Sequence, residues 1–300
     1  MTAGSDDGVR PVDDAPTVIF LHIGKTAGST LRHVLRRQFR ASETMVVRSP
    51  VRDPKRLRRE ETLAYFAGLP ETERRRPRLI LGHTIFGLHE YVPRPSTYIT
   101  LIRNPVSLVL SQYYYVRRTP GHWLYETAQR MTLDEYVRSG VSLETDNSQT
   151  RAISGDTTTE FGHCSRAMLD VARRNIEEHF SVIGLVERFD ASLVMLGRHF
   201  GWSKLAYVRV NVAPQNQRRE VSTDTREAIE RQNAIDLELY GQVQQAFDRR
   251  VDADPAFERD LRRLQRQKAF YTPWGRLTRT WPRRVLNTIG VRRHPPPEIV

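Results

Sequence analysis

The stretch Val18–Thr30, with the sequence VIFLHIGKTAGST, decides the fold class of this 300-residue chain. Its first six residues, Val18–Ile23, form a continuous apolar run of strand length, of the kind found in buried parallel strands. Apolar residues then recur at helical spacing from Leu31 to Phe39, so a helix follows within a few residues. A strand, a tight turn and a helix in this order open a βαβ unit.

The turn inside this stretch resembles a nucleotide-binding P-loop but lacks one of its glycines. Residues 24–26 match the end of the Walker pattern, whereas Ile19 stands where the pattern has its first glycine. Backbone N–H groups at a helix N-terminus still attract an anion, and Lys25 adds a positive charge. The alternative is that residues 28–30 only make a turn and cap the helix. His22 is expected to face the sheet interior or to support the loop.

Later segments repeat the pattern of strand followed by helix. Short apolar runs predict strands at 78–82, 98–102 and 181–186. Asn104 and Pro105 suit the first positions of a helix that continues through Arg118. Asp190 is expected to cap a helix over residues 191–200.

A long amphipathic helix is predicted from Ile229 to Phe247. Loops or short helices are expected at 41–60, 118–130 and 139–165. The whole pattern predicts an α/β chain with a P-loop NTPase-like, three-layer fold, in which a central parallel sheet is flanked by helices. The predicted organisation is a flexible leader over 1–16, one α/β domain over 17–250 and a basic extension over 251–300.

Ligands of an open parallel sheet bind beyond the carboxyl ends of its strands. His83 and Arg103 stand at two of these predicted ends, and Ser111 follows Arg103 by eight residues, or about two helical turns. A P-loop kinase needs Mg²⁺, usually held in part by an Asp at such a strand end, whereas His83 and Arg103 suit anions. The residues therefore favour a transfer without a metal, such as that of a sulfuryl group, which carries less charge than a terminal phosphoryl group.

Three motifs resemble those of the carbohydrate sulfotransferases. HIGKTAGST (22–30) is similar to the loop that binds the 5′-phosphosulfate in that family, and IRNPVSLVLSQYYYVRR (102–118) is similar to its 3′-phosphate element. GHTIFG (82–87) resembles the strand end that carries the catalytic base in the uronyl 2-O-sulfotransferase branch. Looser matches to small bacterial members extend the resemblance over residues 17–248. One departure is Gly24, where the family often has proline.

The resemblance implies a PAPS-dependent O-sulfotransferase, with 3′-phosphoadenosine 5′-phosphosulfate (PAPS) as co-substrate and no metal. Lys25 would neutralise the bridging oxygen as the adenosine 5′-phosphate leaves, and Arg103 with Ser111 would bind the 3′-phosphate. His83 would take the proton from the acceptor hydroxyl, a task that suits an imidazole. The implied co-substrate-binding residues are Lys25, Thr26, Ala27, Gly28, Ser29, Thr30, Arg103, Ser111, Arg218 and Arg219.

The acceptor is expected to be a hydroxyl of a carbohydrate or glycolipid. Candidates to line its pocket are Asn147, Gln149 and Arg151. His89 is the second candidate for the catalytic base. The tyrosines at 113–115 are expected to pack around the nucleotide element rather than to form a stacking platform.

The positive charge is concentrated at the end of the chain. Of the net charge of +12, residues 259–300 contribute +9, from eleven Arg and Lys against two acids. Trp274, Leu277 and Trp281 lie there at helical spacing, as in an interfacial helix on an anionic membrane. Pro282 and the final HPPPEIV instead favour a broken or disordered segment. The same composition also suits a solvated basic tail, or an arm that binds an acidic glycan or nucleic acid.

The single cysteine excludes an intrachain disulfide, and residues 1–16 lack the apolar core of a signal peptide. No apolar run reaches the ~18–20 residues of a membrane span. The chain is therefore expected to be cytoplasmic, and at most peripheral to a membrane. Two rival functions remain: a P-loop kinase that uses Mg-ATP, and a nucleic-acid-binding protein that relies on the basic tail, although nucleic acid is the less favoured partner.

Overall fold

The computed structural model describes residues 15–47, 59–82, 86–208 and 221–280. At its centre lies a parallel sheet of five strands in the order β2-β3-β1-β4-β5. The strands are β1 (Thr17–Phe20), β2 (Thr44–Val47), β3 (Leu79–Gly82), β4 (Ser96–Ile102) and β5 (Phe180–Leu185). The four strands predicted from the sequence are confirmed, whereas β2 lies in a stretch where only loops or short helices were expected.

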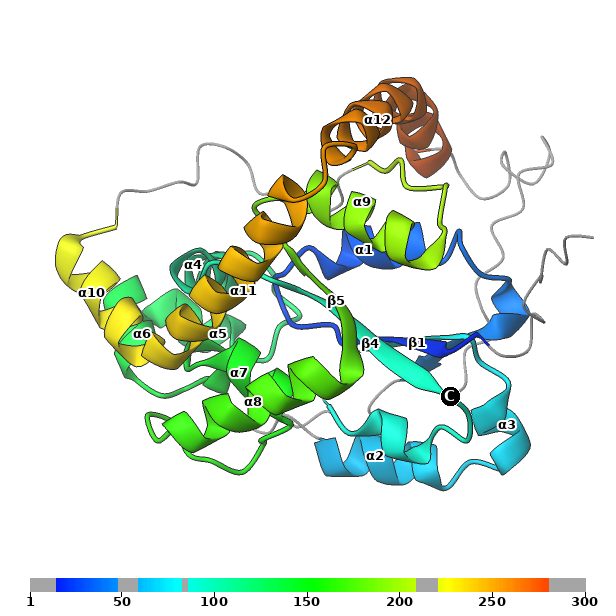
Figure 1. Cartoon of the computed structure of the whole chain (residues 1–300). Helices are drawn as coiled ribbons and strands as arrows, with labels where there is room; N and C mark the ends of the chain where they lie inside the picture. The colour runs from blue at the N-terminus through cyan, green and yellow to red at the C-terminus, as the bar shows by residue number, and fades with distance from the viewer. Residues whose placement is uncertain (1–14, 48–58, 83–85, 209–220, 281–300) are drawn as a thin grey trace, which may run out of the picture.

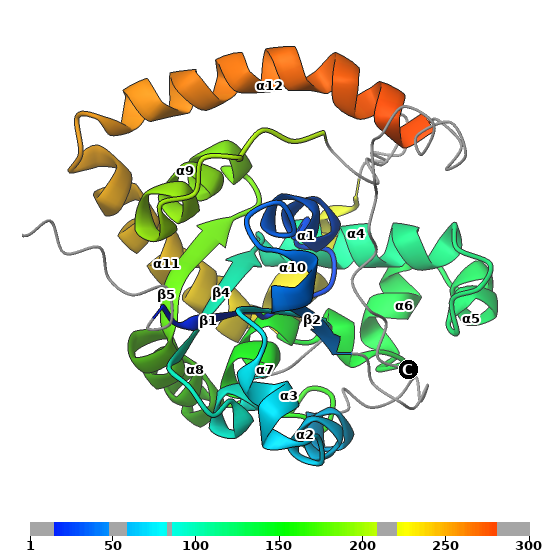
Figure 2. The ribbon, with the colours of Figure 1, turned by 90° about the vertical axis from the view of Figure 1, so that its right-hand side faces the viewer.

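Helices cover both faces of the sheet, which explains why its strands are continuous apolar runs (Figures 1 and 2). On one face lie α1 (Gly28–Leu35), α9 (Phe189–Phe200) and, outermost, α12 (Phe257–Thr280). On the other face lie α2 (Arg59–Ala67), α3 (Glu71–Arg75) and α8 (Arg166–His179). The predicted three-layer α/β fold is therefore confirmed.

The remaining helices gather at the end of the sheet where β4 passes into α4 (Figure 1). They are α4 (Pro105–Arg117), α5 (Tyr125–Arg130), α6 (Leu133–Arg138), α7 (Ser148–Ser154), α10 (Thr223–Gln232) and α11 (Ala234–Asp252). The predicted cap of α4 is confirmed, since the Asn104 side chain accepts a hydrogen bond from the Ser107 amide at 3.2 Å. This cluster faces the carboxyl end of the sheet, where ligands of such folds bind.

Two predicted details of the helices are wrong. The single helix expected from Ile229 to Phe247 is interrupted at Asn233, whose buried side chain donates to Thr145 O at 2.9 Å. Asp190 does not cap α9, because the helix already begins at Phe189. The carboxylate of Asp190 instead accepts a hydrogen bond from Lys268 Nζ at 2.7 Å.

The compact part of the chain continues beyond residue 250, where the basic extension was expected to begin. Phe257 and Leu264 of α12 are buried in the same core as the sheet, and α12 packs on α9. The helix continues to Thr280, and Pro282 and the final HPPPEIV, where a broken segment was expected, lie outside the described residues. None of the helices in the described ranges is long and apolar enough to cross a membrane.

Candidate active site

The loop between β1 and α1 has an unusual backbone. Lys25 and Ala27 have φ angles of 60° and 59°, the left-handed region that residues other than glycine rarely adopt. Thr26, between them, has no exposed surface, and its hydroxyl donates to Ile23 O at 2.9 Å. The Thr26 hydroxyl therefore fixes the shape of the loop. Such strained loops occur where a ligand is bound.

Gly28 begins α1 and has a steric reason to be glycine. A Cβ at this position would lie 1.9 Å from two ring atoms of His22. The His22 ring in turn stacks on Phe20, with ring centroids 5.3 Å apart. His22 therefore supports the loop, which is one of the two roles expected for it from the sequence. The first turn of α1 presents backbone N–H groups to the loop, including those of Ser29 and its neighbours.

The Lys25 side chain is partly buried and lies close to an aromatic ring and to other charged side chains. Its Nζ atom lies 3.6 Å from the centroid of the Tyr115 ring, a cation–π contact. Burial, together with the nearby charges of Arg118 and Arg103, lowers the pKa of Lys25 to about 8, while the charge of Glu144 opposes this shift. Three cations in one half-buried region repel one another, so the region favours an anionic ligand.

Arg103 follows β4 directly and is fixed from two sides. Its Nη1 donates to Lys25 O at 3.1 Å, which ties the end of β4 to the loop. Its backbone amide donates to Gln149 Oε1 at 2.7 Å, and the Gln149 Nε2 donates back to Arg103 O at 2.9 Å. The Nε of Arg103 is buried with no hydrogen-bond partner among the described residues. A buried donor without a partner is uncommon and indicates a place for a ligand acceptor.

Ser111 lies on the side of α4 that faces the loop. It precedes Tyr115 by four residues, and residues at this spacing share one face of a helix. Because the Tyr115 ring contacts Lys25 Nζ, Ser111 is on the same side as the Lys25–Arg103 pair. The structure thus brings together the loop, Arg103 and Ser111, which the sequence placed 78 to 86 residues apart.

Glu144 was not identified from the sequence. Its Oε2 accepts a hydrogen bond from Gln112 Nε2, and its Oε1 lies 3.7 Å from the position of a Cβ on Gly24. Burial raises the pKa of Glu144 to about 7, and the charge of Lys25 opposes that rise. Glu144 lies in a 3₁₀ turn within a stretch expected to hold loops, where no pattern distinguishes it from a solvated acid.

His122 and Trp123 extend the site away from Lys25. The His122 ring meets Tyr115 edge-on, with centroids 5.9 Å apart, and stacks on Trp123 at 5.8 Å. His122 Nδ1 accepts from the Leu124 amide at 3.1 Å, so the proton of its neutral ring is on Nε2, which is a donor. Burial and Lys25 lower the pKa of His122. Trp123 is 42% exposed, an unusual exposure for so large an apolar ring.

The three residues expected to line the acceptor pocket are buried in the protein instead. Arg151 has no exposed surface, and its Nη2 pairs with the buried Asp146 at 2.6 Å. The Asn147 side chain donates to Asp146 Oδ1 at 2.8 Å and accepts from the amide of Asp236 at 3.0 Å. With Gln149 also buried, none of the three faces an acceptor in this structure. Asn147 and Gln149 bond to Asp236 of α11, and Gln149 also positions the backbone of Arg103. Arg151 instead donates to the carbonyls of Thr159 and Glu160.

Of the two candidate bases, His83 and His89, only His89 lies within the described residues. His83 lies outside the described residues, one position after the end of β3, and Arg218 and Arg219 also lie outside them. His89 is described, and its ring packs on His179 at 4.2 Å and on Tyr98 at 5.5 Å. Tyr98 precedes Arg103 by five strand residues, or about 16 Å. His89 is therefore at the other end of β4 from the loop, which argues against it as the base.

Across the described ranges, no group of three His, Cys, Asp or Glu side chains is arranged to hold a metal ion. An anion-binding loop at the carboxyl edge of a parallel sheet, beside a helix N-terminus, defines a P-loop-like α/β protein. The family model for galactose-3-O-sulfotransferases matches residues 2–270, and the chain belongs to that family. The finer placements, in the uronyl 2-O branch and among bacterial-type members, are not confirmed by this match.

Individual relatives support the same family. Galactose-3-O-sulfotransferase 3 of Bos taurus is 28% identical over 282 residues, which cover 85% of this chain and 64% of the relative. Galactosylceramide sulfotransferase of Mus musculus is 26% identical over 268 residues, covering 83% of this chain and 60% of the relative. The chain thus spans about three fifths of the length of these curated relatives.

Solved structures were matched as well. A sulfotransferase from Alicyclobacillus acidocaldarius aligns with 78% of this chain and 99% of its own at 16% identity, with a TM-score of 0.40. A likeness at this TM-score is too distant to support a functional comparison.

Proposed function

We propose that this protein transfers the sulfuryl group of PAPS to a hydroxyl of a galactose-containing acceptor. The observation that carries the proposal is the cluster of Lys25 and Arg103 beside the N-terminus of α1, in a chain of the galactose-3-O-sulfotransferase family. The acceptor class comes from the names of the relatives, which act on galactose or galactosylceramide.

In the proposed reaction the acceptor oxygen attacks the sulfur atom in line with the leaving phosphate. The bond between sulfur and the bridging oxygen breaks, and adenosine 3′,5′-bisphosphate leaves with the electron pair of that bond. His83 takes the hydroxyl proton, as the resemblance implies. Lys25 offsets the negative charge that develops on the bridging oxygen. The products are a sulfate ester and the bisphosphate.

The two ends of the nucleotide are assigned to two parts of the site. Backbone N–H groups of residues 27–29 and the Lys25 ammonium hold the 5′-phosphate, as at other helix N-termini, while the Thr30 amide already donates to Ala27 O at 3.0 Å. Arg103, whose Nε is a buried donor without a described partner, and Ser111 hold the 3′-phosphate. Arg218 and Arg219 remain candidates to close over the nucleotide. When PAPS is bound, its anionic groups relieve the repulsion that lowers the pKa of Lys25.

The acceptor sugar is assigned to Trp123 in place of the three buried residues. Trp123 is exposed, and two successive ring contacts, with His122 and Tyr115, connect it to Lys25. An indole offers a flat apolar surface on which the C–H face of a pyranose packs. Trp123→Ala should raise the KM for the acceptor and leave the bisphosphate Kd unchanged. Phe270→Ala, which removes an aromatic ring that is 84% exposed, is the matched control.

A P-loop kinase is the second candidate because of Glu144. A carboxylate close to Lys25 is the residue type that such a kinase would need for Mg²⁺. The Oε2 of Glu144 already accepts from Gln112, and burial raises its pKa toward neutrality, whereas magnesium requires an ionised carboxylate. These two observations favour the sulfotransferase.

Calorimetric binding of adenosine 3′,5′-bisphosphate, compared with Mg-ATP, tests the proposal. We expect tight binding of the bisphosphate in the presence of EDTA, and its loss in Arg103→Ala. His83→Gln should bind the bisphosphate like the wild type but should not form a sulfated product from PAPS and lactose, as followed by mass spectrometry. A preference for Mg-ATP that is lost in Glu144→Gln would instead establish the kinase.

A further inference from the structure

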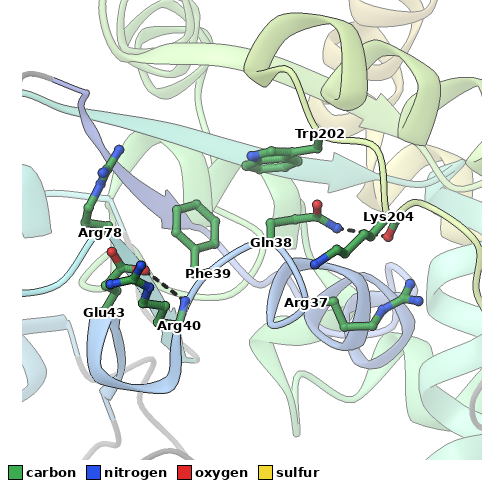
Figure 3. A pocket seen from close by; sticks show the side chains of 8 residues that line it. All are labelled: Arg37, Gln38, Phe39, Arg40, Glu43, Arg78, Trp202 and Lys204. Carbon is green, nitrogen blue, oxygen red and sulfur yellow. Dashed lines mark hydrogen bonds between the residues drawn. The ribbon is translucent and has the colours of Figure 1, made fainter. Parts of the chain in front are cut away.

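A polar cavity lies at the end of the sheet opposite to the candidate active site. It has a volume of about 400 Å³ and is shown in Figure 3. Its walls come from residues 37–40 after α1, from Glu43, from Arg78 just before β3, and from Trp202 and Lys204 after α9. These segments all lie where the strands begin, because α1 and α9 run back antiparallel to the sheet.

The distance between the two sites follows from α1. Gly28, at the donor loop, is the first residue of this eight-residue helix, and Arg37 lies just beyond its last residue. Eight helical residues span about 12 Å. A ligand in the cavity would therefore not contact the phosphates proposed for the loop.

The cavity has an excess of positive charge. Arg37, Arg40, Arg78 and Lys204 contribute four cations, against one carboxylate. That carboxylate, Glu43, is engaged by the backbone amide of Arg40, which donates to its Oε2 at 2.8 Å. Four cations around one concave surface give it a positive potential that attracts an anion.

Arg37 is one of these four cations, and its side chain has partners outside the cavity. Its guanidinium is held in place by the carbonyl of Ala206 and by the ring of Tyr271, whose centroid is 4.8 Å from Arg37 Cζ. Its Nε is nevertheless a buried donor with no hydrogen-bond partner among the described residues. In Figure 3 the Arg37 guanidinium points away from Phe39 and Trp202, so Arg37 adds positive charge to the wall of the cavity but its buried Nε does not face the ligand.

Aromatic rings form the apolar part of the cavity. Trp202 stacks on Phe200, with centroids 4.5 Å apart, and meets Phe39 edge-on at 5.7 Å. In Figure 3 the Trp202 indole and the Phe39 ring lie between the cations of the two walls. The side chain of Gln38, whose Nε2 donates to Lys204 O at 2.9 Å, adds an amide to the same surface. Aromatic rings beside hydrogen-bonding groups suit a sugar ring, which has an apolar face and polar edges.

We propose that this cavity binds an anionic saccharide, a sugar of one or two rings that carries a sulfate or carboxylate group, separately from the donor and acceptor of the reaction. Its size, about that of a small-ligand pocket, fits a short saccharide. A nucleic acid strand is less suited, because such strands are bound along extended basic grooves with successive stacking platforms. The inference rests on the cavity alone and is independent of the proposed sulfotransferase activity.

Calorimetry on the full chain, saturated with adenosine 3′,5′-bisphosphate to occupy the donor site, tests this inference. The probes are lactose 6′-sulfate, lactose, inorganic sulfate and a single-stranded deoxyoligonucleotide. The test variant is the double change Arg40→Ala and Lys204→Ala, since both side chains are exposed and their only described polar contacts are through backbone atoms. Arg249→Ala with Arg250→Ala removes two exposed cations of α11 as the matched control.

We expect the sulfated disaccharide to bind more tightly than lactose or sulfate, and at least about fivefold more weakly to the test variant than to the wild type or the control. Its binding should change the fluorescence of the protein, and Trp202→Phe should abolish that change. An equal loss in the control pair would mean general charge attraction and would overturn the proposal. So would equal affinity for inorganic sulfate, or tighter binding of the oligonucleotide at the same ionic strength. Binding of the bisphosphate itself, measured first, reports separately on the donor site.

Discussion

The ammonium group of Lys25 lies 3.6 Å from the centroid of the Tyr115 ring. This contact joins the loop after β1 to the third turn of α4, which the chain reaches only 90 residues later. The ring's negative face is a partner for the lysine, while Arg103 and Arg118 repel it. A bound anion would replace this weak partner with a strong one, and the first two predictions below concern the charges around this anion site.

Binding of the bisphosphate should be linked to protonation of Lys25. With a pKa of about 8 in the free protein, Lys25 is about nine-tenths neutral at pH 9 and one-tenth neutral at pH 7. Because the anion favours the charged form, binding should take up close to one proton at pH 9 and much less at pH 7. Calorimetry in buffers of different ionisation enthalpy measures this number. Lys25→Arg keeps the charge throughout and should lose the difference, and equal uptake in both proteins would contradict the prediction.

Glu144→Gln should strengthen binding of the bisphosphate above pH 7 only. The pKa of Glu144 is about 7, so the carboxyl is mostly ionised at pH 8 and mostly neutral at pH 6. Its negative charge near the anion site should weaken the wild type about three- to tenfold at pH 8. Glutamine still accepts the hydrogen bond of Gln112, so the fold should be kept. The ratio of the two dissociation constants should fall toward one as the pH drops to 6, and a constant ratio would rule out this role.

Gly28→Ala should abolish nucleotide binding while the protein stays folded. The added Cβ would lie 1.9 Å from the His22 ring, so either the ring or the loop must move. The double variant Gly28→Ala with His22→Ala removes the obstacle and should recover part of the affinity. His22→Ala alone is the control, and circular dichroism checks the fold. Failure of the second change to restore any binding would place the defect elsewhere than in this contact.

Arg151→Ala should destabilise the whole domain. Removing one partner of the buried pair with Asp146 leaves an uncompensated carboxylate, which costs about 3–5 kcal/mol. Arg138→Ala breaks the pair with Asp134, where both side chains are exposed, and is the matched control. Urea denaturation should show a large drop in the free energy of unfolding for the first variant and little change for the second. Similar drops would show that burial does not decide the difference.

Truncation should separate the two parts of the basic C-terminal region. Removing residues 281–300 should leave bisphosphate binding intact. Removing 251–300 should lower the melting temperature strongly, because Phe257 and Leu264 belong to the core and Lys268 pairs with Asp190. Thermal unfolding followed by binding on each protein tests this. A nucleic-acid-binding protein that relied on its tail would lose its affinity for an oligonucleotide already in the shorter deletion.

The parts of the site that the sequence predicted share a local signal. Lys25 and Arg103 each follow a continuous apolar strand, and the rule for parallel sheets is enough to place both at one edge. The fold class follows from the same strands. Strand β2 was not predicted from the sequence, because its four residues lie between charged stretches and form an apolar run too short to be distinguished from a loop.

The roles of residues 146–151 could not be read locally, because their partners are far along the chain. Asn147 and Gln149 look like solvated loop residues until Asp236 comes to lie beside them. Glu144 likewise depends on the packing of its turn against α4. The residues expected to line the acceptor pocket are buried instead, and burial depends on the whole fold rather than on the local sequence. The cytoplasmic location and the membrane contact of the tail stay predictions.

The left-handed backbone of Ala27 also bears on how readily the loop accepts a ligand. A glycine would adopt this conformation freely, but it would adopt many others as well. Alanine has far fewer conformations open to it, and the hydroxyl of Thr26 next to it already holds the turn. The loop therefore has little conformational entropy left to lose when an anion arrives, so more of the attraction to Lys25 and the helix amides is available as affinity.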